Sequence, residues 1–129
     1  MDWEPLIEAA WQTRDRAHAP YSKFHVGAAL LAGGRVFTGC NVENLSFGLS
    51  MCAERVAVGT AIAAGSRKIE AVAVVADTGV PISPCGACRQ VLAEFGDPLI
   101  CLVNREERVV FRLSELLPRA SAGILDREE

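Results

Sequence analysis

The stretch Ile69–Ala76, with the sequence IEAVAVVA, is a nearly uninterrupted apolar run. Runs this short and this apolar are typical of a β-strand that is covered on both faces. Helical segments are expected on either side of it, over residues 51–64 and residues 83–95. A covered strand between two helices predicts an α/β protein, in which helices pack on a sheet.

The segment before the first of these helices has the pattern of a helix followed by a hairpin. Residues 5–17 carry apolar side chains at the spacing of an amphipathic helix, with a proline in its first turn. Residues 24–31 and Arg35–Cys40 are two apolar runs separated by the pair Gly33 and Gly34. A glycine pair between such runs predicts an antiparallel hairpin.

The segment after the last of these helices supplies two further strands, Leu99–Val103 and residues 109–111. Their connection is too short for a crossover helix, so this pair is expected to be antiparallel. A short closing helix is expected over residues 113–117. The predicted element order is α-β-β-α-β-α-β-β with that closing helix, which means one mixed sheet flanked by helices.

Length and charge limit the possible functions. The chain has 129 residues, of which 50% are hydrophobic, and 13 basic against 16 acidic residues. We therefore expect a single domain over residues 1–129, and the charge balance disfavours nucleic-acid binding, which normally uses a basic face. No apolar run approaches the roughly 18 residues of a membrane span, and the acidic N-terminus does not resemble a signal peptide. An odd count of five cysteines favours a reducing, cytoplasmic location and metal binding over disulfides.

Two cysteines, Cys85 and Cys88, lie at the expected start of the helix over residues 83–95. With Ser83 as N-cap and Pro84 in the first turn, both thiols would lie on one face near the helix N-terminus. The partial positive charge there favours thiolates, and two thiolates can bind a zinc ion. Taken alone, the Cys-x-x-Cys pattern fits a redox dithiol equally well.

The triplet Cys52-Ala53-Glu54 favours the metal. Ser50 as N-cap would place Cys52 at another helix N-terminus, which gives a third thiolate. Three protein ligands and one open position are typical of catalytic zinc, whereas structural sites usually have four. Glu54 could then be a catalytic carboxylate, or an ordinary first-turn acid stabilised by the helix dipole. Cys40 could supply a fourth ligand, although its position in a strand favours packing.

A zinc dication bound by three thiolates carries a net negative charge, which opposes the ionisation of bound water. Two helix N-termini and a nearby cation would offset that charge. Arg55 and Arg89 each follow a ligand cysteine. We expect Arg55 to donate hydrogen bonds to the thiolates. For Arg89, a solvated side chain is an equally good interpretation.

These residues carry a resemblance to a known family. Cys52-Ala53-Glu54 followed by residues 84–88, PCGAC, resembles the signature of zinc nucleoside and nucleobase deaminases in which cysteine replaces histidine. Residues 20–29 (PYSKFHVGAA), 39–44 (GCNVEN) and 88–92 (CRQVL) are similar to the small homotetrameric cytidine deaminases. The similarity extends over residues 5–118. It implies their three-layer α-β-α fold with a mixed five-stranded sheet.

The resemblance implies hydrolytic deamination of cytidine or deoxycytidine to the uridine nucleoside, in pyrimidine salvage. Zn²⁺ bound by Cys52, Cys85 and Cys88 would lower the pKa of a water molecule that attacks C4 of the pyrimidine. Glu54 would take the water proton, pass it to ring nitrogen N3 and protonate the departing amine.

The resemblance also implies the substrate contacts. Phe24 would lie against the base, Asn41 and Glu43 would bind the ribose 3′-hydroxyl, and Ala53 would also contact the substrate. Alternation in an extended chain independently puts Asn41 and Glu43 on one side. On residue type alone, Asn41 and Glu43 could be turn residues and Phe24 a core residue.

Three positions depart from the family pattern. Leu45 and Phe47 stand where the family has alanine and tyrosine, near a neighbouring subunit's nucleoside. Ser121 stands where the family has a phenylalanine that stacks on the base from another subunit. These changes leave open a deaminase of another aminopyrimidine, as in the blasticidin S deaminases, although Asn41 and Glu43 favour a ribose. A non-catalytic zinc-stabilised module is the alternative from a different class, and a deaminase of polynucleotides is disfavoured by the acidic charge.

Association is expected from the helix over residues 51–64. Residues 56–64 carry no charge on any side. A helix that is apolar all round is normally buried all round. We therefore expect its outer face to pack against a second copy of the chain, as a homo-oligomer, with the tetramer implied by the resemblance.

Overall fold

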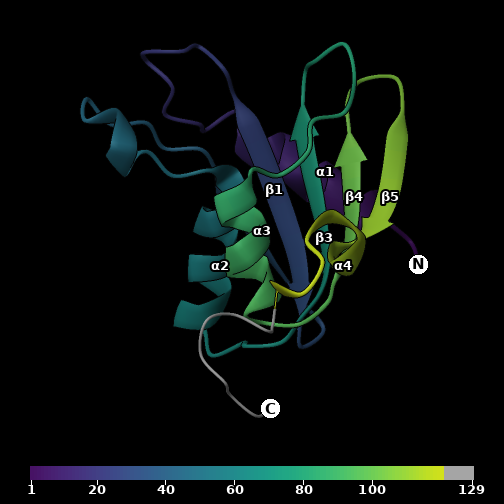
Figure 1. The fold of residues 1–129 in the computed structure, drawn as a ribbon. Coiled ribbons are helices and arrows are strands. Elements are labelled where there is room, and N and C mark those ends of the chain that lie inside the picture. Colours follow the sequence, from purple (N-terminus) through teal and green to yellow (C-terminus); the bar gives the residue numbers. More distant parts are fainter. Residues whose placement is uncertain (121–129) are drawn as a thin grey trace.

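A mixed five-stranded sheet organises the computed structural model, which describes residues 1–120. The expectation for Ser121 lies outside these residues. The strand order is β2-β1-β3-β4-β5, in which β3 and β4 are parallel and the other neighbours are antiparallel (Figure 1). The strands are β1 (Val26–Ala32), β2 (Arg35–Cys40), β3 (Ile69–Ala76), β4 (Leu99–Val103) and β5 (Arg108–Arg112).

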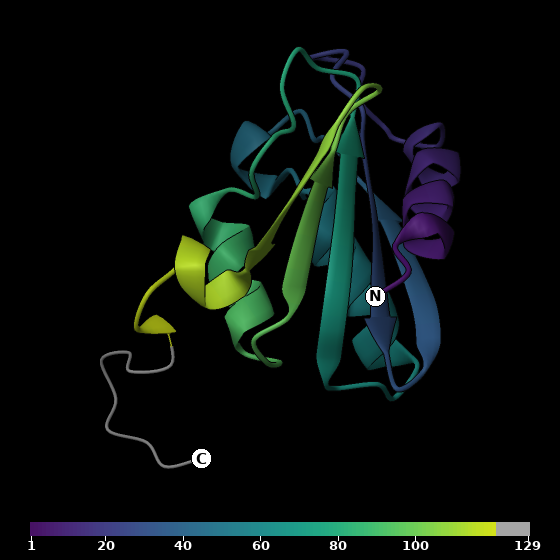
Figure 2. The same cartoon turned by 90° about the vertical axis from the view of Figure 1, so that its right-hand side faces the viewer.

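Helices cover both faces of this sheet, which confirms the predicted three layers. Figure 2 shows α1 (Glu4–Arg14) alone on one face, whereas α2, α3 and α4 lie on the other. These three helices are α2 (Ala53–Ala63), α3 (Gly86–Ala93) and α4 (Leu113–Leu116). Among residues 1–120, every helix lacks the length and apolar character that crossing a bilayer requires.

The central strand β3 is buried on both faces, as its apolar run predicts. Ala71, Ala73 and Val75 pack in the cluster that contains α1. Val72 and Val74 alternate with them and pack in the cluster that contains α2 and Leu92 of α3. Strand periodicity therefore divides one apolar run between two cores.

The hairpin between β1 and β2 turns at the predicted glycine pair. Gly33 and Gly34 have φ angles of 60° and 75°, in the left-handed region. Positive φ at both central residues is the requirement of a two-residue type I′ turn, which matches the twist of paired strands. The turn aligns Ala32 with Arg35 and fixes the register of the pair.

The starts of two helices differ from the prediction. The N-cap of α2 is Cys52 instead of Ser50, and the N-cap of α3 is Cys85 instead of Ser83. The Ser50 hydroxyl accepts a hydrogen bond from the backbone N–H of Asn44 at 3.1 Å, within the preceding loop. Ser83 precedes a proline, which disfavours helical backbone at that position.

Two smaller boundary shifts occur near the N-terminus. The first helix ends at Arg14 instead of residue 17, and β1 begins at Val26 instead of residue 24. Lys23 has a φ of 61°, outside the range of strand geometry, and thus separates Phe24 from regular pairing. Phe24 is therefore a loop residue with 43% of its surface exposed.

Candidate active site

Three cysteine thiols converge where the N-termini of α2 and α3 meet. Cys52 and Cys85 are the N-caps of these helices, and Cys88 lies one turn into α3. The distance from Cys52 Sγ to Cys85 Sγ is 3.8 Å, and that from Cys85 Sγ to Cys88 Sγ is 3.4 Å. All three sulfur atoms lie within 4.8 Å of one another. The two sequence motifs, 33 residues apart, thus form one cluster.

The cluster has the dimensions of a zinc site. Tetrahedral zinc with Zn–S bonds of about 2.3 Å places its sulfur ligands about 3.8 Å apart. The measured separations are close to this value, and the donors are the soft thiolates that zinc accepts. Neither Cys40 nor Cys101 belongs to the cluster, within the part of the chain that the structure describes. The donor set therefore fits one zinc ion with three protein ligands.

Hydrogen bonding among the thiols favours ionisation of one of them. The pKa of Cys52 falls to about 5, chiefly because Cys88 donates a hydrogen bond to it and also because Arg55 lies beside it. The pKa of Cys88 rises, because its proton is shared with Cys52 and because the side chain is buried. The cluster already stabilises thiolate, the form that binds a metal.

Arg55 lies beside the thiols, where the sequence predicts a donor. Its Nη2 is 3.8 Å from Cys52 Sγ and 3.4 Å from the carbonyl oxygen of Ser50. Its Nε is buried and has no hydrogen-bond partner among residues 1–120. The guanidinium thus brings a positive charge to the thiolates, and one of its donors remains unpaired.

Glu54 follows Cys52 by two residues and is 4% exposed. Burial is the largest cause that raises its pKa, to about 7. Two residues within a helix would separate the side chains by roughly 200°. Cys52 is not helical, since it is the N-cap with a ψ of 154°, and this allows both side chains to reach the space beyond the helix end.

A cleft of about 280 Å³ opens beside this cluster. It is lined by Glu54, by two of the thiol residues, and by all four residues predicted to bind substrate. Those four are Phe24, Asn41, Glu43 and Ala53. Five further residues line the cleft without having been predicted: Val26, Ser50 and Met51, and, from the loop between β3 and α3, Ile82 and Ser83. No sequence signal points to Ile82, and the residue types of Ser50 and Ser83 favour helix N-caps instead.

Asn41 connects the loop that carries Phe24 to Val26, the first residue of β1. Its Nδ2 donates to the carbonyl oxygen of Phe24 at 2.7 Å, and its Oδ1 accepts from the N–H of Val26 at 2.9 Å. Both atoms of the amide are therefore engaged with the backbone around Phe24. Asn41 positions this side of the cleft as well as lining it.

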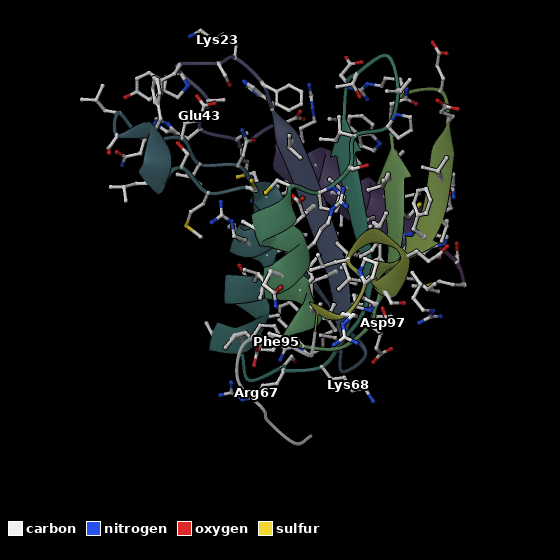
Figure 3. The ribbon with its side chains drawn as sticks, viewed as in Figure 1. Lys23, Glu43, Arg67, Lys68, Phe95 and Asp97 are labelled. Atoms are coloured by element: carbon white, nitrogen blue, oxygen red, sulfur yellow. The ribbon has the colours of Figure 1, made fainter. Side chains whose placement is uncertain are left out.

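Glu43 stabilises the same loop through its carboxylate (Figure 3). Oε1 accepts from the N–H groups of Tyr21 and Ser22 at 3.0 and 3.1 Å, and the Ser22 hydroxyl donates to Oε2. The hydrogen bond from the Ser22 hydroxyl is the largest cause that lowers the pKa of Glu43 below its usual value, and the two backbone N–H groups lower it further. These hydrogen bonds stabilise the fold fully at a pH above the pKa that Glu43 has in the unfolded chain. The stabilisation is lost as the pH falls through the lower pKa of Glu43 in the folded protein.

Arg89 makes contacts that exclude a freely solvated side chain. Its Nε donates to the carbonyl oxygen of Pro84 at 2.8 Å, and its Nη1 donates to that of Leu116 at 2.7 Å. The guanidinium is part-buried, and the partners it has are backbone carbonyls. Arg89 and Arg55 therefore act on different parts of the site, although each follows a ligand cysteine by a few residues.

The cysteine cluster lies where two helix N-termini meet, beside a mixed sheet, and a buried carboxyl lies next to it. These features define an α/β protein of the zinc-binding class. The sequence profile described as "Cytidine and deoxycytidylate deaminase zinc-binding region" matches residues 2–104. The chain belongs to this deaminase family, and the zinc cofactor predicted from the cysteines agrees with it.

Curated relatives support the same family. The chain is 55% identical to the cytidine deaminase of Sporosarcina psychrophila over 127 residues, which cover 93% of this chain and 91% of the relative. It is 50% identical to the cytidine deaminase of Halalkalibacterium halodurans, at 93% and 94% coverage. The crystal structure of cytidine deaminase from Burkholderia pseudomallei superimposes with a TM-score of 0.87 at 51% identity, covering 92% of this chain and 98% of that one.

Proposed function

We propose that this chain catalyses the zinc-dependent hydrolytic deamination of cytidine and deoxycytidine to the uridine nucleosides, a step of pyrimidine salvage. The observation that carries the proposal is the 280 Å³ cleft, onto which Glu54, two thiol residues and the four expected substrate contacts all open. Relatives with about half of their residues identical bear the name cytidine deaminase. That agreement supports the same reaction here.

The cysteine cluster and Glu54 carry the chemistry in this proposal. Cys52, Cys85 and Cys88 bind zinc, which when bound supplies a Lewis acid that lowers the pKa of water. Glu54 takes a proton from the attacking water and gives it to ring nitrogen N3; it then takes the proton of the resulting C4 hydroxyl and gives it to the departing amine. Its burial keeps the carboxyl away from bulk water.

The remaining side chains hold the nucleoside. Phe24 packs against the base, and Ala53, the first residue of α2, borders it. Asn41 and Glu43 bind the ribose. A carboxylate can accept about four hydrogen bonds, so Glu43 can hold the Tyr21–Ser22 backbone and still accept one from a sugar hydroxyl.

A second candidate is the deamination of another aminopyrimidine nucleoside or analogue. Phe47 is 72% exposed and lines a hollow next to the cleft, which shares Glu43 and Ser50 with it. Phe47 contacts Tyr21 edge to face and offers no hydroxyl. An apolar neighbour at this point favours a substrate group less polar than a ribose 5′-end.

We also propose a domain organisation, a compartment and an oligomeric state for the enzyme. We infer that residues 1–129 act as a single cytoplasmic domain, with five free thiols suited to a reducing compartment. We infer further that the domain works as a homo-oligomer, a tetramer by resemblance. Its substrate is a free nucleoside and its acidic charge does not suit a polynucleotide.

The proposal is tested with the purified protein and the variant Glu54→Gln. Ammonia release is measured with cytidine, deoxycytidine, cytosine and blasticidin S. We expect turnover of cytidine and deoxycytidine, and a loss of about a thousandfold or more in Glu54→Gln because general acid–base transfer is removed. Zinc content and melting temperature are expected to change little.

The matched control is Glu70→Gln, the same change at an exposed glutamate of β3. It is expected to keep full turnover. Full activity in Glu54→Gln would show that the proton carrier is misassigned. Inactivity on cytidine with turnover of blasticidin S would establish the second candidate, and bound zinc without any turnover would indicate a non-catalytic module.

A further inference from the structure

The loop between β3 and α3 ends at a buried proline that immediately precedes a metal-binding cysteine. Pro84 is less than 2% exposed, and Cys85 follows it as the exposed N-cap of α3. A buried carbonyl group without a hydrogen-bond partner is costly, so the Pro84 carbonyl requires a donor. The Pro84 carbonyl and the Cys85 nitrogen belong to the same planar peptide group, so the position of this carbonyl also fixes the backbone of Cys85.

Arg89 supplies the donor. Its Nε binds the Pro84 oxygen at 2.8 Å, while its backbone N–H binds the Cys85 oxygen at 3.0 Å. Two consecutive carbonyls around the metal ligand are thus held by one residue. The first of these hydrogen bonds is charge-assisted, and such bonds are about twice as strong as neutral ones.

The same guanidinium reaches a distant element. Arg89 Nη1 donates at 2.7 Å to the oxygen of Leu116, the last residue of α4. The last carbonyls of a helix have no partner within the helix, so this oxygen is free to accept. Figure 1 shows α3 and α4 side by side. Arg89 therefore bridges the metal-binding turn and an element 27 residues further along the chain.

We propose that Arg89 is a positioning residue for the metal ligand Cys85, which it holds by clamping the Pro84 carbonyl against the end of α4. The planar guanidinium can bind both carbonyls at once, whereas a lysine ammonium is a single point charge. Without the clamp, the loop is free to move Cys85 Sγ away from Cys52 Sγ, at present 3.8 Å distant. The proposal rests on zinc binding by this cluster.

Arg112 provides a matched control on the other end of α4. It is the N-cap residue of α4, and its Nη1 donates to the carbonyl oxygen of Asp97 at 2.9 Å. Like Arg89, Arg112 is an arginine that donates to a backbone carbonyl and contacts α4. Its carbonyl partner, however, lies in the loop between α3 and β4 and not beside the cysteine cluster. If loosening of α4 alone caused faster zinc release, the release rate would rise equally in variants of Arg89 and of Arg112.

The experiment compares Arg89→Gln, Arg89→Lys and Arg112→Gln with the wild-type protein loaded with zinc. The rate of zinc release to a chromogenic chelator is measured, together with kcat, KM and the melting temperature. We expect release about tenfold faster in Arg89→Gln, the size typical for partners that orient metal ligands. Arg89→Lys should lie between Arg89→Gln and wild type, because one carbonyl can still be bound. Arg112→Gln should release zinc at the wild-type rate.

In activity measurements, Arg89→Gln should lower kcat more than it raises KM, because the substrate contacts are unchanged. Release at the wild-type rate in both Arg89 variants would overturn the proposal, as would equally fast release in Arg112→Gln. Should Arg89→Gln fail to fold, Arg89→Lys decides the matter through the same release rate. Wild-type protein without zinc would overturn the proposed metal site and this role of Arg89 with it.

Discussion

At the scale of single residues, the site depends on cysteines that occupy N-cap positions. Cys52 and Cys85 have extended backbone, with ψ angles of 154° and 166°. Their side chains are therefore not restricted to the faces of their helices and can meet across the two N-termini. Ser50 and Ser83 satisfy the usual N-cap preference, and for that reason the sequence predicted the helix starts two residues early.

The substrate side of the cleft could be predicted only in part from residue types. The sequence indicated Asn41 and Glu43 through alternation in an extended segment, and both line the cleft. The hydrogen bonds from Ser22 to Glu43 join residues 21 positions apart in the chain. Contacts of this kind follow from the path of the loop, which local pattern does not specify.

Glu43→Gln tests whether this carboxylate holds the nucleoside as well as the loop. We expect KM for cytidine to rise roughly tenfold with a smaller change in kcat, since a charge-assisted hydrogen bond is replaced by a weaker one. Steady-state kinetics at neutral pH provide the measurement.

Ser22→Ala is the control, because it leaves the carboxylate in place and removes only the two hydrogen bonds of the Ser22 hydroxyl, which donates to Glu43 and accepts from the Phe24 N–H at 3.0 Å. Its KM should change by less than that of Glu43→Gln. Equal effects of the two substitutions would mean that Glu43 acts only on the loop.

At the scale of elements, the packing of α2 on β2 depends on a residue without a side chain. A Cβ atom at Gly39 would lie 2.4 Å from the backbone nitrogen of Ala57 and 2.5 Å from the oxygen of Ala53. Both atoms belong to the backbone of α2, so they cannot move independently of the helix. Since Cys52 and Glu54 flank Ala53, this close approach fixes the height of the site above the sheet.

Gly39→Ala is therefore expected to displace α2. The predicted cost is about 2 kcal/mol of unfolding free energy, in the range of overpacked cores, together with weaker zinc binding. Urea denaturation and chelator competition measure the two effects. Gly79→Ala, where a Cβ atom meets nothing within 4 Å, should change the stability by less than about 0.5 kcal/mol. Similar values for both variants would contradict the role assigned to Gly39.

The elements themselves were largely predictable because their patterns are local. The apolar run of β3 and the glycine pair of the β1–β2 turn each define one element without help from the rest of the chain. The partner of Arg89 was not predictable. Its bond to Leu116 exists only because α3 and α4 pack together on the same face of the sheet (Figure 1).

At the scale of the whole molecule, apolar surface remains on the side formed by α2 and the loop before it. Leu45, Phe47 and Leu49 are between 68% and 78% exposed. On α2, Gly59, Thr60 and Ala63 are exposed and uncharged. Exposed apolar surface of this kind is typical of a protein interface.

Sedimentation velocity at micromolar concentration tests the association that this surface predicts. We expect species larger than the 13.8 kDa monomer. Ala63→Glu, which places a charge on the outer face of α2, should shift the distribution towards monomer with secondary structure retained. A wild-type protein that sediments only as monomer would contradict the expected homo-oligomer.

The proposed activity requires that sulfur atoms from two helix N-termini bind a single zinc ion and leave one position for water. X-ray absorption at the zinc edge of the purified protein tests it most directly. We predict one zinc per chain with three sulfur neighbours at about 2.3 Å and one lighter neighbour, unchanged in Cys40→Ser. A fourth sulfur in the coordination shell, or a purified chain that binds no zinc, would contradict it.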